Sequence, residues 1–583
     1  MSENVIYSIN GPVVKVRNTK AFSMLEMVYV GNNRLIGEVI SVSKLETTIQ
    51  VYESTTGLKP GEPVASTGKP ISVTLGPGIL RNIFDGIERP LKEMAKESGS
   101  FIATGSSIAP LDANALWDVT IKVKAGDELK GGAIYATCPE TDLIEHRMMV
   151  PPYLSGVVKK VKADGQYHVD DVIVELEDHE GQIHELTLCQ RWPIKNPRPV
   201  ANRMPIEVPL ITGQRVIDTL FPIAKGGTAA IPGGFGTGKT MTQHQLAKWC
   251  DADIIVYVGC GERGNEMTQV LEEFQELIDP KSNKPLTDRT VLIANTSNMP
   301  VAAREASIYT GVSLAEYYRD MGYHVAIMAD STSRWAEALR EISGRLEEMP
   351  AEEGFPAYLP SRISQFYERA GYMHNLNGSE GSVTIIGAVS PQGADFSEPV
   401  TQNTKRFVRC FWALDKALAY ARHYFAINWN QSYSEYVTDL ERWYNRNLGM
   451  HFVSDRKQIT ALLAEETKLM EIVKLIGADV LPDDQKLVIE ISRVIRVGFL
   501  QQNAFHKEDT YVPLPKQLKM MESILNLYAK SKEAMQRGVA ASSILKTGIY
   551  EKVVSMKYDI PNDKLEMFDD LDHRVDETIR VLR

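Results

Sequence analysis

The sequence predicts a multidomain protein: a small N-terminal β-barrel, an inserted β domain, a central α/β domain and a C-terminal α-helical domain. Three observations lead to this prediction. At 583 residues the chain is too long for one hydrophobic core. Its pattern changes from short alternating strands to strands mixed with helices, and then to helices alone. A complete G-x-x-x-x-G-K-T motif stands in the mixed part.

Composition narrows the class of protein. With 43% hydrophobic and 24% charged residues the chain can build substantial cores, and a net charge of −11 without a basic block argues against a dedicated nucleic-acid binder. No run of about 18 uncharged apolar residues predicts a membrane span, and the first residues do not read as a signal peptide. The five cysteines lack metal-ligand spacing, which suggests reduced thiols in a cytosolic protein. Any link to a membrane should therefore pass through partners.

Residues 1–70 read as a barrel of short strands, because close-spaced alternating segments are separated by turn residues such as Asn10-Gly11 and Pro60-Gly61. The expected strands cover residues 5–9, 12–16, 27–30, 34–40 and 48–52. Residues 71–114 are interpreted as the connection from this barrel to the α/β domain that contains the G-x-x-x-x-G-K-T motif.

Residues 115–190 predict a separate, inserted β domain, with strands at 119–123, 156–161 and 171–176. The arrangement is similar to modules in which a lysine at a hairpin tip carries lipoyl or biotinyl groups. Lys159 and Lys160 fall inside a strand instead, so we interpret the insertion as a scaffold or docking surface.

Residues 200–435 alternate between strands and helices. The strand candidates are near-continuous apolar runs, which a parallel sheet covered on both faces requires; they lie at 254–258, 290–294, 325–329 and 382–386. Residues 436–583 show a helical period with few glycines and prolines, including an apolar stripe from Ile459 to Ile476, and predict a helical domain up to Arg583.

The glycine-rich motif predicts a triphosphate site. It consists of Gly233, Gly234, Phe235, Gly236, Thr237, Gly238, Lys239 and Thr240. The glycines let backbone N–H groups turn towards phosphate oxygens, Lys239 can reach the β- and γ-phosphates, and the Thr240 hydroxyl can ligate Mg²⁺. A strand is expected before the motif and a helix at 241–249 after it, with the helix N-terminus facing the phosphates. The alternative is a glycine-rich turn that binds nothing.

Two carboxylates follow predicted strands. Glu262 comes after the strand at 254–258, where it could activate an attacking water, and the neighbouring Arg263 could approach the γ-phosphate. Asp330 ends the strand that begins at His324 and is a candidate for the Mg²⁺ shell, acting through water. Each carboxylate could instead be an ordinary loop or strand-end residue.

Aromatic rings could hold an adenine base, because stacking suits a planar ring. Phe425 and Phe505 are the candidates, although spacing alone fits a core position equally well.

Together these segments resemble the catalytic A subunit, called the alpha chain in prokaryotes, of the V/A-type rotary ATPases. The inserted β domain adds to the resemblance, since F-type catalytic subunits and the non-catalytic B subunit lack it. The matching blocks are residues 212–222, 233–240, 259–267, 294–304, 328–341, 347–350 and 397–402.

The resemblance implies a RecA-like α/β domain that binds ATP or ADP with Mg²⁺, in a ring of three A and three B subunits. It implies that Lys239 contacts phosphate, that Thr240 faces Mg²⁺ and that Glu262 orients the hydrolytic water. It also implies that Arg263 meets the γ-phosphate, while an arginine finger comes in trans from the B subunit. Phe425 and Phe505 match the adenine-side aromatics of that family.

The expected function is therefore ATP hydrolysis or synthesis coupled to H⁺ or Na⁺ translocation. The expected partners are the B subunit, central and peripheral stalks and, indirectly, a membrane rotor, with the chain at the cytoplasmic face and no nucleic acid bound. Eukaryotic relatives often carry cysteine where this chain has Thr237, which together with the compact insertion suggests a prokaryotic protein.

Three alternatives stay open at this point. A Rho-like hexameric RNA-translocating ATPase shares the barrel and ATPase plan, but the acidic balance opposes it. A regulatory nucleotide-binding subunit would not need both Lys239 and Glu262. A protein-export ATPase would not need the insertion at 115–190.

Overall fold

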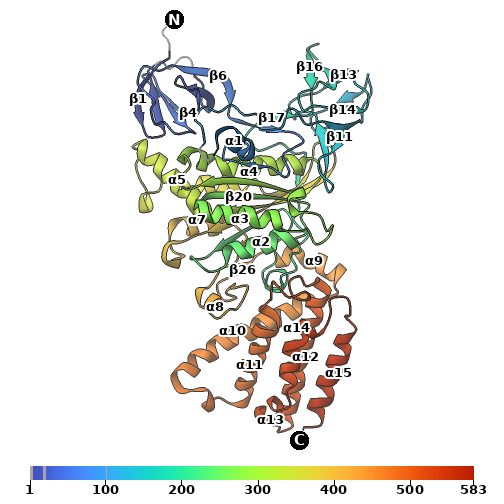
Figure 1. The fold of residues 1–583 in the computed structure, drawn as a ribbon. Helices are drawn as coiled ribbons and strands as arrows, with labels where there is room; N and C mark the ends of the chain where they lie inside the picture. The colour runs from blue at the N-terminus through green and yellow to red at the C-terminus, as the bar shows by residue number, and fades with distance from the viewer. Residues whose placement is uncertain (1–3, 18–21, 100–101, 583) are drawn as a thin grey trace. The chain divides into compact units, whose positions relative to one another are not determined.

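The computed structural model describes residues 4–17, 22–99 and 102–582. The chain forms two compact units (Figure 1). The first unit comprises Met1–Pro205, Gly226–Thr228 and Ala252–Phe407, and the second comprises Ile206–Lys225, Ala229–Asp251 and Val408–Arg583. The predicted α/β domain at 200–435 thus contributes to both units. Arg583, where the predicted helical domain ends, lies outside the described residues, as do short parts of the predicted barrel and connection.

The first unit begins with the predicted β-barrel. Its six strands pair in the order β1-β2-β5-β4-β3-β6, all antiparallel, and enclose a core of mostly valine and isoleucine side chains. The strands are β1 (Ile6–Asn10), β2 (Val13–Val16), β3 (Glu26–Val30), β4 (Leu35–Val42), β5 (Thr47–Val51) and β6 (Val64–Pro70).

The connection and the insertion share a two-stranded stem. β7 (Ser72–Leu75) precedes the insertion and pairs antiparallel with β17 (Gln190–Pro193), which follows it. The connection also contains β8 (Ile83–Phe84) and helix α1 (Leu91–Ser98). Because the chain leaves and returns through neighbouring strands, the insertion is a separate lobe of the first unit.

The inserted domain consists of two four-stranded antiparallel sheets around one apolar core. One sheet has the order β10-β13-β15-β16 and the other β12-β11-β9-β14. Lys159 and Lys160 lie in β13 and pair across the strands with Glu177 at 2.6 Å and Glu175 at 3.3 Å. The strands are β9 (Trp117–Ile121), β10 (Glu128–Leu129), β11 (Ile134–Pro139), β12 (Glu145–Met149), β13 (Gly156–Val161), β14 (Gly165–Tyr167), β15 (Val174–Glu177) and β16 (Ile183–Leu186).

A buried polar network joins the inserted domain to helix α4 (Val301–Asp320). His146 Nδ1 lies 2.9 Å from Glu140 Oε2, and its Nε2 lies 2.8 Å from the Tyr317 hydroxyl. The Tyr318 hydroxyl donates to Glu140 at 2.9 Å. Since all these groups are buried and bonded, the network fixes the base of the insertion on α4.

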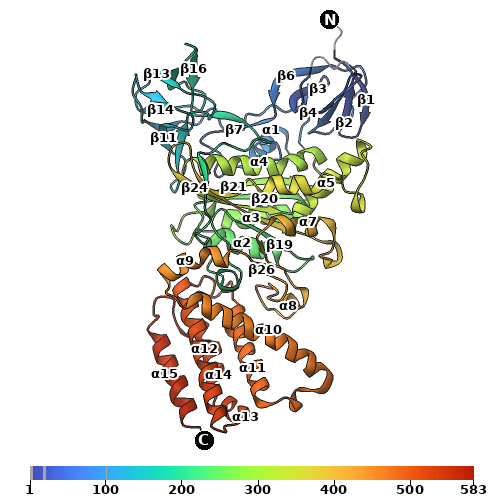
Figure 2. The same ribbon diagram turned by 180° about the vertical axis from the view of Figure 1, so that it is seen from behind.

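The α/β part of the first unit is a parallel sheet with the order β24-β22-β20-β21-β8. Helices α4 and α5 lie on one face and α3 on the other (Figures 1 and 2). Coverage on both faces explains the apolar runs in the sequence. The strands are β20 (Ile254–Glu262), β21 (Thr290–Thr296), β22 (His324–Asp330) and β24 (Glu380–Val389), with β18 (Asn202–Met204) and β23 (Gly371–His374) antiparallel beside β24. The helices are α3 (Gly264–Glu276), α4, α5 (Thr332–Arg345), α6 (Leu359–Tyr367) and α7 (Pro399–Phe407), with 3₁₀ turns η2 (Leu286–Arg289), η3 (Glu352–Gly354) and η4 (Gln392–Ala394).

The second unit carries the glycine-rich loop between β19 (Thr228–Pro232) and α2 (Lys239–Trp249). β19 pairs parallel with β25 (Cys410–Phe411), which pairs antiparallel with β26 (Tyr433–Ser434). The unit also contains the π-helical turn η1 (Val216–Leu220) and the short helix α8 (Lys416–Tyr420).

The rest of the second unit is the predicted helical domain, whose longer helices run side by side (Figure 2). The predicted apolar stripe is buried only from Ile459 to Leu469; Met470 and Ile476 are exposed, because the last turns of α10 leave the packed helices. The helices are α9 (Val437–Asn447), α10 (Phe452–Ile476), η5 (Ala478–Val480), α11 (Asp483–Val494), η6 (Ile495–Leu500), α12 (Leu514–Gln536), α13 (Ala541–Leu545), α14 (Ile549–Asp559) and α15 (Met567–Arg580). Within the described ranges, no helix combines the length and apolarity that crossing a membrane requires.

Candidate functional site

The glycine-rich loop has the backbone geometry that its sequence predicts. Gly236 and Gly238 have φ angles of 76° and 86°, in the left-handed region that side chains disfavour. A Cβ atom on Gly233 would come within 2.6 Å of the Thr237 hydroxyl and 2.8 Å of Leu414 Cβ. The loop therefore turns tightly into α2, which begins at Lys239, two residues earlier than predicted.

Lys239 folds back on its own loop. Its Nζ donates to the carbonyl of Gly233 at 2.7 Å and to that of Gly234 at 3.2 Å. The Thr237 hydroxyl donates to Gly234 at 2.8 Å, whereas Phe235 and Thr240 are exposed. Lys239 is thus held inside the loop, at the place where phosphate-loop lysines meet phosphates.

Glu262 is the last residue of β20, which runs four residues further than the predicted strand. The extension pairs Glu262 with Thr296 of β21, and the Glu262 carbonyl accepts a hydrogen bond from Ser297 N at 2.8 Å. Gly261 makes the extension possible, since its φ is 74° and a Cβ there would come within 2.8 Å of Arg334 Cβ. The sequence predicted that the strand ends at residue 258 and that Glu262 lies after it, whereas Glu262 is the last residue of the strand. The prediction was wrong because Gly259 and Gly261 suggested a loop.

Asp330 ends β22, as expected, and is buried next to β20. Its register partner is Gly259, and its carboxylate accepts a hydrogen bond from the Tyr257 hydroxyl at 3.3 Å. Burial and then the negative charge of Asp330 raise the pKa of Glu262 to about 8, helped by Glu266. The structure therefore brings Glu262 and Asp330 together at one edge of the sheet.

Two arginine residues, Arg263 and Arg334, lie near Glu262. Arg263 is the exposed N-cap residue of α3, directly after Glu262. Arg334, in the first turn of α5, lowers the pKa of Glu262 and pairs with Glu337 at 3.0 Å. Sequence reasoning gave Arg334 no role, although it lies in one of the matching blocks, because its distance from Glu262 along the chain hides their proximity.

The two candidate aromatics have different environments in the second unit. Phe425 is 2% exposed, whereas Phe505 is 89% exposed. Their segments lie side by side, since Gln502 N donates to the Tyr424 carbonyl at 2.7 Å. The exposed Phe505 ring can therefore stack on a planar base. Phe425 is buried, so only a small part of its ring can contact a ligand.

The oxygen donors at these positions suit Mg²⁺. The exposed Thr240 hydroxyl and the Asp330 carboxylate are hard oxygen ligands, which Mg²⁺ prefers alongside water and phosphate. Among the described residues there is no cluster of three histidine, cysteine, aspartate or glutamate side chains that could hold a metal alone. Thr240 belongs to the second unit and Asp330 to the first, and each by itself is an oxygen donor of the kind that Mg²⁺ accepts.

Comparison with protein families places four domains on the chain in order. Residues 6–68 match the ATP synthase alpha/beta family β-barrel domain, and residues 108–195 match the ATP synthase alpha/beta subunit barrel-sandwich domain. Residues 213–434 match the ATP synthase alpha/beta family nucleotide-binding domain, and residues 441–544 match the C-terminal domain of V and A type ATP synthases. The fold and its phosphate loop thus define a protein of the ATP synthase alpha/beta class, which confirms the predicted architecture.

Relatives that align over nearly the full length of the chain show which family within this class it belongs to. The chain is 62% identical to the V-type ATP synthase alpha chain 2 of Clostridium tetani, covering 96% of this chain and 94% of that one. It is 60% identical to the V-type ATP synthase alpha chain of Halothermothrix orenii (98% and 97%) and 55% identical to the A-type ATP synthase A subunit of Methanopyrus kandleri (99% and 98%). The chain belongs to the family of V/A-type ATP synthase alpha chains, also called A subunits.

One solved structure shares the fold at low identity. It is the assembled ATPase EscN of the type III secretion system of enteropathogenic E. coli, with 21% identity and a TM-score of 0.63, covering 90% of this chain and 100% of that one. The likeness shows the fold alone. The Rho-like alternative finds no support in any of these comparisons.

Proposed function

We propose that the chain is the catalytic subunit of a V/A-type rotary ATPase. It hydrolyses or synthesises ATP at interfaces with B subunits, and it couples this turnover to H⁺ or Na⁺ translocation across a membrane. The observation that carries the proposal is the pair of Glu262 and Asp330 at neighbouring strand ends, in a chain that also holds a complete phosphate loop. The names of the relatives support it.

The phosphate loop binds the nucleotide. The backbone N–H groups of the loop and the N-terminus of α2 attract phosphate oxygens. Lys239 exchanges its bonds to the Gly233 and Gly234 carbonyls for bonds to the β- and γ-phosphates. The exposed Phe505 ring stacks on the adenine, with Phe425 forming the wall behind it.

Glu262 holds the attacking water. An ionised Glu262 accepts a proton from that water as the water approaches the γ-phosphate, and Arg263 stabilises the phosphate charge. Thr240 and, through water, Asp330 would hold Mg²⁺. When bound with ATP, Mg²⁺ supplies positive charge that neutralises the phosphate oxygens.

Because its pKa is raised, Glu262 must lose a proton before it can act as a base. While burial and Asp330 favour the protonated form, Glu262 cannot accept a proton. Positive charge beside the two carboxylates would lower the pKa of Glu262 and so favour its ionised form. A bound nucleotide with its cation would therefore increase the fraction of Glu262 that is ionised and able to act as the base.

The chain is expected to need partners for turnover. An arginine finger from the B subunit, in a ring of three A and three B subunits, would supply a rate factor of roughly 10³ to 10⁵. The helical domain of the second unit would pass torque to a central stalk and hence to the membrane rotor, while a peripheral stalk holds the ring. In this proposal the chain would lie at the cytoplasmic face as a peripheral part of a membrane complex.

Co-expression with the neighbouring B-type subunit tests the proposal. The expected product is a three-plus-three ring whose ATPase activity needs both chains and is lost with Glu262→Gln. A lone chain with full ATPase activity, or RNA-stimulated ATPase activity of the isolated chain, would overturn it.

A further inference from the structure

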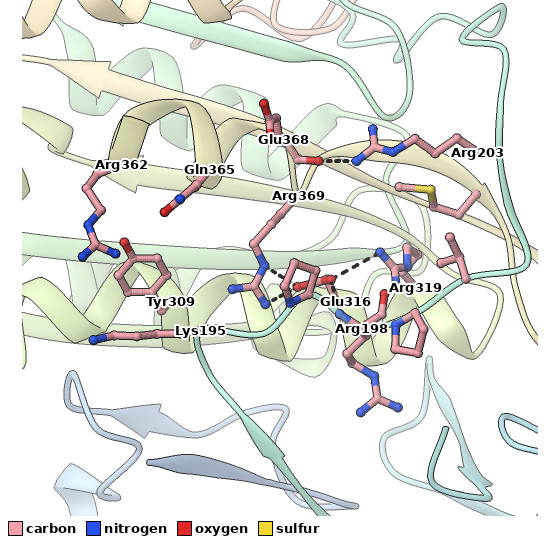
Figure 3. Close-up of a pocket in the computed structure, with 14 residues that line it drawn as sticks. Lys195, Arg198, Arg203, Tyr309, Glu316, Arg319, Arg362, Gln365, Glu368 and Arg369 are labelled. Carbon is pink, nitrogen blue, oxygen red and sulfur yellow. Dashed lines mark hydrogen bonds and ion pairs between the residues drawn. The ribbon is translucent and has the colours of Figure 1, made fainter. Parts of the chain in front are cut away.

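A cavity in the first unit is lined by none of the predicted site residues. It has a volume of about 510 Å³ and lies between the segment 195–203 and helices α4 and α6 (Figure 3). This volume falls within the range of small-molecule sites, roughly 300 to 1,000 Å³.

Cationic side chains dominate the lining. Six basic residues face two acidic ones, Glu316 and Glu368. Pro197, Val200 and Met373 add an apolar stretch of wall. The basic residues are Lys195, Arg198, Arg203, Arg319, Arg362 and Arg369.

The floor of the cavity is a buried ion network with an excess of positive charge. Arg369 Nε donates to Glu316 Oε1 at 2.6 Å, and Arg319 Nη2 lies 2.8 Å from Asp320 Oδ1. Arg198 Nε lies 2.7 Å from Asp320 Oδ2. These three guanidinium groups share two carboxylates, and all five side chains are at most 10% exposed. Since uncompensated charge is costly where water is scarce, the network favours an anion in the cavity.

The rim adds donors at both ends. Arg203 is exposed and donates to the backbone carbonyl of Glu368 (Figure 3) and, at 3.1 Å, to that of Ala370; neither carbonyl carries a formal charge. At the other end Arg362 lies beside Tyr309 (Figure 3). An anion in the cavity could therefore be held at either end by a planar donor group, which suits phosphate and carboxylate oxygens.

We propose that this cavity binds a small multivalent anion of the phosphate class, either free phosphate or the phosphate group of an organic molecule. The site is separate from the phosphate loop in sequence and in chemistry, because arginine side chains replace backbone N–H groups as donors. Its occupation would neutralise the excess positive charge between α4, α6 and the segment 195–203.

Calorimetric titration of the full chain tests this proposal. The Lys239→Ala variant serves as the background, so that the phosphate loop does not contribute, and the probes are inorganic phosphate, pyrophosphate and ribose 5-phosphate at low salt. Saturable binding of one equivalent is expected. Tighter binding of pyrophosphate than of ribose 5-phosphate would identify the free anion as the ligand, and the reverse order an organic phosphate.

Variants of the rim separate a specific site from general attraction. In the same background, Arg203→Gln should weaken binding about tenfold to a hundredfold, because a charge-assisted donor is lost. Arg362→Gln probes the opposite end in the same way. Arg537→Gln is the matched control, since Arg537 is also exposed and donates to a backbone carbonyl, that of Ile579 at 3.2 Å. Absence of saturable binding up to about 10 mM, or equal binding by all three variants and their background, would overturn the proposal.

Discussion

Asp330 ends β22 opposite Gly259 of β20, and its negative charge adds to burial in raising the pKa of Glu262 at the end of β20. Two carboxylates at one sheet edge hold less negative charge than they would in water. The positive groups nearby, Arg334 among them, only partly offset this effect. A cation beside these carboxylates would therefore favour their ionised forms. The raised pKa of Glu262 can be measured in the free chain, without ATP turnover.

The free energy of unfolding of Glu262→Gln, relative to that of the unmodified chain, should increase as the pH rises from acidic to alkaline. Because the folded-state pKa of Glu262 is raised to about 8, the folded chain binds more protons than the unfolded chain between the two pKa values. The stability of the unmodified chain is therefore greatest below the unfolded pKa and falls as the pH rises through 8. Glutamine removes this loss, on the order of 1 kcal/mol or more. Thermal midpoints of both proteins between pH 5 and pH 9 check the prediction, and a constant difference between them contradicts it.

Glu262→Gln should also abolish turnover while leaving nucleotide binding nearly intact. Loss of a positioned base typically reduces rate by roughly 10² to 10⁴, whereas the amide keeps the size of the side chain. ATPase activity of the ring with the B subunit, together with Mg-ADP affinity, measures both effects. Glu272→Gln on the exposed side of α3 is the control and should keep full activity. A Glu262→Gln ring with more than a tenth of normal activity would remove Glu262 from the chemistry.

The two aromatic candidates should separate by stability and by affinity. Phe425→Ala should cost about 3 to 5 kcal/mol of unfolding free energy, because Phe425 is buried. Phe505→Ala should leave the thermal midpoint unchanged but weaken ADP binding about tenfold, since an exposed ring loses only its stacking. Denaturant unfolding and nucleotide titration distinguish these outcomes. Unchanged ADP affinity in Phe505→Ala would exclude the stacking role.

Asp509→Asn should loosen the segment that carries Phe505. Asp509 forms a fully buried ion pair with Arg215 and accepts a hydrogen bond from Asn503 N at 2.7 Å. Removing one charge leaves Arg215 buried without its partner, which costs about 3 to 5 kcal/mol. A lower thermal midpoint and faster amide exchange at 501–509 are expected. Asp563→Asn, at an exposed position, is the control and should change neither; equal midpoints for both variants would contradict the prediction.

Much of this protein could be predicted from local sequence patterns. The glycine-rich loop, the apolar strands and the change to a helical period predict the order of the domains, since each feature depends on neighbouring residues. Element ends were less accurate: β20 extends to Glu262 although glycines interrupt its apolar run, and α10 loses its buried face after Leu469.

The sequence by itself determined that this chain has a phosphate loop, a strand ending in Asp330 and the motif blocks of one ATPase family. These features lie within short segments, where backbone geometry and residue chemistry suffice. Only the tertiary structure decided which distant groups share an environment: Asp330 and Arg334 with Glu262, Arg215 with Asp509, and six basic residues around one cavity. The physical reason is that burial and charge act through space, so the pKa of Glu262 depends on neighbours that its own segment does not contain.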